Sequence, residues 1–123
     1  MADLSPSQSG LDTAYVADDA TGLIKWSLVG SSWITNSVTG VDADDYRGVT
    51  GIVSGTSVTL FATRGGNQLV VITDTSGYNA AQNGTPVLMS TAGTNKAYRG
   101  VALAPVSVVA LMSQLPLAFR SDP

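Results

Sequence analysis

Short runs in which apolar and polar residues alternate cover most of the chain, and residues that favour turns separate them. Alternation with a period of two is typical of β-strands that bury one face. Gly, Ser, Thr and Asn stand between the runs, where tight turns need them. The pattern predicts an all-β protein with two groups of four antiparallel strands: 13–17, 23–29, 33–38 and 47–53, then 58–63, 69–73, 86–90 and 99–103.

A four-residue motif occurs twice and indicates an internal repeat. Tyr46-Arg47-Gly48-Val49 recurs as Tyr98-Arg99-Gly100-Val101, 52 positions later. Upstream, residues 14–19 match residues 59–64 in pattern, and each segment leads into a turn and a second apolar run. About fifty residues holding four antiparallel strands have the dimension of one β-propeller blade.

The repeat also predicts the organisation of the chain. We expect residues 1–105 to form a two-blade β-propeller unit and residues 106–123 to form an apolar tail. Within that tail, residues 107–112 resemble residues 57–62 and could start a further blade.

The repeats resemble those of a known family. The strings at residues 15–19, 22–28, 46–49 and 98–105 are similar to the β-propeller repeats found at the ends of large bacterial secreted or surface proteins. The resemblance implies an extracellular or cell-surface location. No N-terminal segment combines a basic start with an apolar stretch, so we expect a signal peptide to be absent or to have been removed.

A blade is apolar on both broad faces, so each face has to be covered by a neighbour. We expect either a homo-oligomer that completes a ring or a place within the rest of a larger propeller. The alternative is a sandwich, in which the two sheets face each other within one chain.

Composition narrows the function further. The chain has no Cys and no His, which removes disulfides, thiolate nucleophiles and Ser–His catalysis, and we find no phosphate loop or nucleophile elbow. We therefore expect no enzyme. The net charge of −3 provides no basic surface for nucleic acid. Residues 101–117 are the most apolar segment, but Pro and Ser interrupt it, so no membrane span is expected.

Arg47 and Arg99 stand at equivalent places in the two motifs. Lining a central channel, they could hold carboxylates or sugar hydroxyls. The alternative is that each guanidinium pairs with an acidic residue of its own or a neighbouring blade and holds the repeat together.

Two further groups of residues are candidates for ligand binding. Asp42, Asp44 and Asp45 offer carboxylate oxygens that calcium would accept, although the spacing is not that of an EF-hand and a solvated turn is the alternative. Trp26 and Trp33 could stack on a sugar, but neither has a counterpart in the second unit, which favours burial between blades.

Two functions follow from these observations. The first is a non-catalytic structural or protein-interaction module of β-propeller type. The second is a glycan-binding, lectin-like propeller assembled from several copies of the chain. No cofactor is expected, apart from the calcium that the acidic loop could hold.

Overall fold

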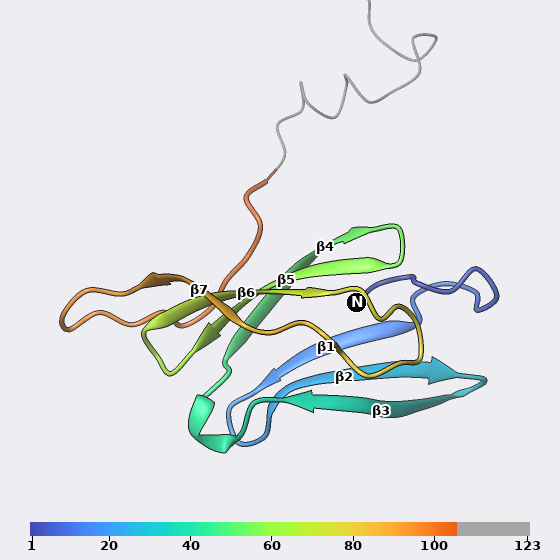
Figure 1. Ribbon diagram of the computed structural model, residues 1–123, viewed down its shortest axis with the longest axis horizontal. Coiled ribbons are helices and arrows are strands. Elements are labelled where there is room, and N and C mark those ends of the chain that lie inside the picture. Colours follow the sequence, from blue (N-terminus) through green and yellow to red (C-terminus); the bar gives the residue numbers. More distant parts are fainter. Residues whose placement is uncertain (106–123) are drawn as a thin grey trace, which may run out of the picture.

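The computed structural model describes residues 1–105, which form seven β-strands and one short 3-10 turn. The strands build two antiparallel sheets (Figure 1): a first sheet with the order β1-β2-β3 and a second sheet with the order β4-β5-β6-β7. The predicted all-β class is confirmed. The elements are β1 (Thr13–Asp18), β2 (Gly22–Val29), β3 (Ser32–Thr39), η1 (Asp42–Asp44), β4 (Gly48–Ser54), β5 (Ser57–Arg64), β6 (Gln68–Asp74) and β7 (Val87–Thr91).

The predicted division into two four-stranded groups is wrong. Residues 47–53, expected as the fourth strand of the first group, instead form β4 at the start of the second sheet. The reason is local: β4 and β5 are joined by a two-residue turn, in which Gly55 adopts a φ of 60°. Between β3 and β4, η1 and the left-handed Asp45 turn the chain away from the first sheet.

The second motif is not a strand. Residues 99–103, predicted as the last strand, have no regular structure. The backbone N–H of Tyr98 donates to the carbonyl of Gly66 at 2.8 Å, and a Cβ placed on Gly48 would lie 2.9 Å from the Cα of Gly100. The two copies of the motif therefore lie side by side, although only the first one enters a sheet. Residues 106–123, with the predicted strand at 107–112, lie outside the described residues.

The core lies between the two sheets. Alternate residues of β5 and β6 are buried there, and Tyr15 and Ala17 of β1 pack against them. The fully or almost fully buried apolar side chains of the second sheet are Val58, Leu60, Ala62, Val70 and Ile72. We call these opposed surfaces the inner faces and the two surfaces that point away from them the outer faces.

The hairpins β1–β2 and β5–β6 correspond residue by residue. The last pairs of their ladders, Asp18↔Gly22 and Arg64↔Gln68, each enclose three turn residues and are 46 positions apart. Neither hairpin contains a bulge, so the offset of 46 extends along both ladders. The match predicted between residues 14–19 and 59–64 is therefore wrong by one position, and a slip of one residue exchanges the two faces of a strand.

This correspondence determines how the sheets are oriented. Figure 1 shows the β1–β2 and β5–β6 turns at the same end of the molecule, and the β2–β3 and β6–β7 connections at the other. Tyr15 points to the inner face of the first sheet, whereas its counterpart Phe61 alternates with the buried Leu60 and Ala62 and points to the outer face of the second sheet. The second sheet therefore has the same orientation as the first. The face of the second sheet that is equivalent to the inner face of the first sheet points away from the first sheet.

The last strand of each sheet pairs through a bulge. The register shifts between Lys25 and Trp26 where β2 meets β3, and between Leu69 and Val70 where β6 meets β7. Within residues 1–105, no helix has the length and apolar character that crossing a membrane requires.

Candidate functional site

A buried ion pair joins the inner faces. Lys25, on β2, and Asp74, at the end of β6, are each 1% exposed, and Nζ of Lys25 lies 2.8 Å from Oδ2 of Asp74. The same ammonium donates to Oγ of Ser76 at 2.8 Å and to the carbonyl of Gly77 at 2.7 Å. All three of its hydrogens therefore have acceptors, which is the condition under which a buried charge is tolerated.

Both oxygens of the Asp74 carboxylate also accept hydrogen bonds. Its Oδ2 also accepts the hydroxyl of Tyr15 at 2.6 Å, while its Oδ1 accepts the backbone N–H and the hydroxyl of Ser76 at 2.9 and 2.6 Å. Burial by itself raises the pKa of Asp74, but hydrogen bonds from Lys25, Ser76 and Tyr15 outweigh it and lower the pKa to about 2. Asp74 is therefore ionised throughout the neutral range.

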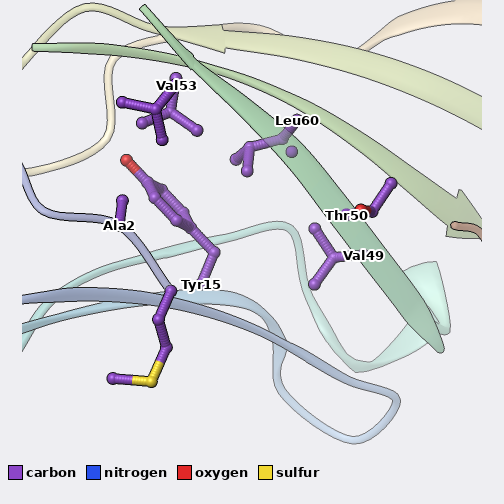
Figure 2. A pocket seen from close by; sticks show the side chains of 9 residues that line it. Ala2, Tyr15, Val49, Thr50, Val53 and Leu60 are labelled. Carbon is purple, nitrogen blue, oxygen red and sulfur yellow. The ribbon is translucent and has the colours of Figure 1, made fainter. Parts of the chain in front are cut away.

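Tyr15 lies at the centre of this contact. Burial, together with its hydrogen bond to the anionic Asp74, raises the pKa of the Tyr15 phenol far above its ordinary value. Figure 2 shows its ring pointing from β1 towards Val53 and Leu60 of the second sheet, beside a cavity of about 70 Å³.

The connection between β6 and β7 adds a second set of ties between the sheets. The hydroxyl of Tyr78 donates to the carbonyl of Leu28 at 2.6 Å, and the backbone N–H of Gln82 donates to Oγ of Ser37 at 3.0 Å. The backbone N–H of Asn79 donates to Oγ of Ser27 at 3.2 Å. This polar connection therefore lies along β2 and β3 and fixes the position of the first sheet against the second.

Arg47 occupies an open cleft of about 310 Å³ lined by Ala17, Asp18, Asp19, Tyr46 and Arg47 itself. Its guanidinium nitrogens lie 3.8 Å from a carboxylate oxygen of Asp45 and 3.9 Å from one of Asp19. Both distances are long, and both partners are exposed to solvent, so each contact is weak. Asp19 lies in the β1–β2 turn, so Arg47 bridges the start of the second sheet to the first.

Tyr46 is completely buried, and its hydroxyl has no hydrogen-bond partner among the described residues. Burial raises the pKa of this phenol, against a lowering influence of Arg64. Gly40, with a φ of 90°, leaves room for the ring, because a Cβ at that position would lie 2.8 Å from Cε2 of Tyr46.

Tyr98 is only half-buried, and its hydroxyl shares a hydrogen bond of 2.9 Å with Ser90. Arg99 is exposed.

Two carboxylates of the acidic loop contact other groups of the chain. Asp42 and Asp44 belong to η1, and Oδ2 of Asp44 accepts the backbone N–H of Val41 at 2.9 Å. Asp45 points towards Arg47. Within residues 1–105, no group of three or more acidic side chains is arranged to hold a metal ion.

The two tryptophans share the outer face of the first sheet. Trp26 lies opposite Ala14 of β1 and alternates with the inward-pointing Lys25, and Trp33 lies opposite Leu28. Trp33 is 39% exposed, whereas Trp26 is half-buried. Trp33 is the second residue of β3, next to the β2–β3 turn. This turn lies at the opposite end of the sheet from the β1–β2 turn that carries Asp19, so the fold does not bring Trp33 together with Arg47.

The sequence analysis missed Lys25 and Asp74, which are separated by 49 positions. A signal was present: Lys25 is the one charged residue of β2, and Asp74 is the one charged residue of β6. Two single, opposite charges in otherwise apolar or neutral strands indicate a buried pair.

No protein-family model, curated protein or solved structure matches the chain.

Proposed function

We propose that this protein is a non-catalytic structural and protein-interaction module of β-propeller type. One observation carries the proposal: the second sheet repeats the orientation of the first, so its outer face presents the positions that, in the first sheet, are covered by a neighbouring sheet. Successive blades of a propeller stack in this repeated orientation. The face-to-face sandwich has less support, because Tyr15 and its counterpart Phe61 point to different faces.

The contact between the motifs supports the same arrangement. β4 begins with the first motif and lies in contact with β1. The second motif lies against Gly48, on the outer side of the second sheet, as the inner strand of a third blade would. The neighbouring blades would then belong to further copies of the chain or to a larger propeller. The resemblance of the repeats supports an extracellular or cell-surface location.

The polar groups at the centre favour a structural role over catalysis. Lys25, Asp74 and Tyr15 satisfy one another in the interior, and the raised pKa of Tyr15 removes it as a base near neutral pH. The glycan-binding alternative rests on Trp33 and Trp26 alone, because Arg47 lies elsewhere.

A tandem protein tests the proposal. Two full-length chains are joined by a flexible Gly/Ser linker, so that the outer face of one second sheet can meet the outer face of the next first sheet. At micromolar concentration we expect the tandem to unfold at a higher urea concentration than the single chain. The control tandem carries Val71→Lys in its first copy and should lose the gain. Equal midpoints for tandem and single chain would contradict propeller-type stacking, whereas quenching of Trp33 fluorescence by a glycan would favour the lectin-like alternative.

A further inference from the structure

Both outer faces carry exposed apolar side chains within residues 1–105, although the second motif covers the start of the outer face of the second sheet. On the first sheet, Val16, Trp33 and Val38 are 44%, 39% and 46% exposed, and Ile24, Trp26 and Leu28 lie on the same face. On the second sheet, Ile52 and Val87 are 49% and 59% exposed beside Phe61 and Val71. None of these ten residues carries a charge, so these surfaces differ from an ordinary solvated face.

The offset of 46 shows how the outer faces relate to the inner contact. In the first sheet, Tyr15 and Lys25 hold Asp74 of the second sheet. Their counterparts on the outer face of the second sheet are Phe61 and Val71, which oppose each other in the ladder as Tyr15 and Lys25 do.

The third member of the network follows the same rule. The counterpart of Asp74 is Leu28, on the outer face of the first sheet. At these three positions, the outer faces therefore have an apolar side chain where the inner contact has a hydrogen-bonding or charged one: Phe for Tyr, Val for Lys and Leu for Asp. A change on one face alone would leave a buried group unpaired, so the joint change indicates that the two faces are built to meet.

We infer that a second copy of this chain docks the outer face of its first sheet onto the outer face of the second sheet, with Leu28 of one copy against Phe61 and Val71 of the other. The inference rests on the proposed function and adds the partner to it. The contact repeats the internal stacking with an apolar centre. It joins two different surfaces, so it is head-to-tail and each copy keeps one free face for the next.

Paired substitutions test this contact on the full chain. Val71→Lys and Leu28→Asp each put an unpaired charge into the contact, and each should raise the dissociation constant for self-association more than about tenfold. The double variant places Lys opposite Asp, as Lys25 stands opposite Asp74, and should recover association relative to both single variants. Sedimentation velocity at several concentrations gives the masses, and circular dichroism confirms that each variant keeps its strands.

Cross-linking tests the direction of the contact, because the natural chain has no Cys. Val71→Cys chains are mixed with Leu28→Cys chains and treated with a short bis-maleimide. We expect cross-linked dimers in the mixture and few in either variant alone. The matched control mixes Val71→Cys with Asp19→Cys, whose side chain is 63% exposed in the β1–β2 turn at the other end of the first sheet.

The outcomes separate this inference from the proposed function. A wild-type chain that stays monomeric up to millimolar concentration, or a double variant no better than the single ones, would overturn the second copy as the partner. If the tandem protein described above still gains stability, the stacking of sheets stands and only the association between separate chains is wrong. Cross-links of Val71→Cys with itself would overturn the head-to-tail contact in favour of a symmetric one.

Discussion

The equivalent faces of the two sheets differ at their centres: the covered face of the first sheet has polar side chains there, and the open face of the second sheet has apolar ones. Tyr15 and Lys25 occupy two opposed positions of the first ladder, and Phe61 and Val71 occupy the same positions of the second. The polar pair of the first sheet contacts Asp74. The apolar pair of the second sheet lies where the proposed contact would bring Leu28 of a second copy. The comparison teaches that the polarity of a repeated position is determined by its neighbour, while its place in the fold is determined by the ladder.

Removing the cation from the inner contact should have the largest effect. Lys25→Met leaves the carboxylate of Asp74 buried without its counter-ion, and we expect it to lower the free energy of unfolding by about 3 to 5 kcal/mol. Urea denaturation followed by circular dichroism measures the loss.

The control for this change is the double variant Lys25→Met/Asp74→Leu, which carries apolar groups on both sides, as the outer faces do. It should recover most of the stability, since apolar replacement of a whole buried pair is often neutral. A double variant as unstable as Lys25→Met would contradict the idea that the apolar set is an equivalent solution for this contact.

Acid should act mainly on the polar contact. Asp74 has a pKa of about 2 in the folded state, whereas an unfolded Asp has a pKa of about 3.9. Between these two pH values the folded state keeps this carboxylate ionised, while the unfolded state binds a proton. The resulting stability, about 2 to 3 kcal/mol, is complete above pH 5 and is lost as the pH falls towards 2. Stability measured from pH 7 to 2 should fall more steeply in the wild type than in Lys25→Met/Asp74→Leu. Parallel curves would show that Asp74 does not contribute.

Adding a methyl group at Gly48 tests how closely the second motif packs on the outer face of the second sheet. Gly48→Ala would place its Cβ 2.9 Å from the backbone of Gly100, and we expect a loss of about 1 to 3 kcal/mol. The reciprocal change Gly100→Ala is the control, because a Cβ there meets nothing within 4 Å. Thermal unfolding distinguishes the two, and equal effects would mean that the motifs do not depend on this close approach.

Exchanging one hydroxyl between the two faces gives the smallest expected effect. Tyr15→Phe removes a hydrogen bond to the ionised Asp74 and should cost about 1.5 kcal/mol. Phe61→Tyr adds a hydroxyl at the counterpart position, where no carboxylate is expected, and should change monomer stability by less than about 0.5 kcal/mol. Chemical denaturation of both variants measures the difference, and a comparable loss in both would remove the distinction between the faces.

Much of the secondary structure was predictable from local pattern. Seven of the eight predicted strands exist with ends shifted by one residue or so, because alternation and turn residues act over short distances. The assignment of β4 to a sheet was not predictable in that way, since both neighbours offered apolar partners and only the tight turn at Gly55 decides between them. Residues 99–103 have the pattern of a strand, but no strand of residues 1–105 pairs with them.

The inner contact was harder to predict than the strands. Pairing Lys25 with Asp74 requires the register of two hairpins, and an error of one position moves Phe61 from the outer face to the inner one. Turn lengths supply that register, because both hairpins have three-residue turns and these turns are 46 positions apart. The match of apolar and polar pattern had given an offset of 45 between the two hairpins. The expected roles of Arg47, Arg99, Trp26 and Trp33 in ligand binding stay predictions.

The bulges in the last pair of strands of each sheet bear on how the protein behaves at high concentration. A bulge bends its strand and increases the local twist, so β3 and β7 are poor templates for a flat ladder of backbone hydrogen bonds with another molecule. Exposed strands that lack such a device are sites of amyloid-like growth. Concentrated solutions of this protein should therefore resist fibre formation along the β3 and β7 edges, although Ile34 and Met89 there are 40% and 53% exposed.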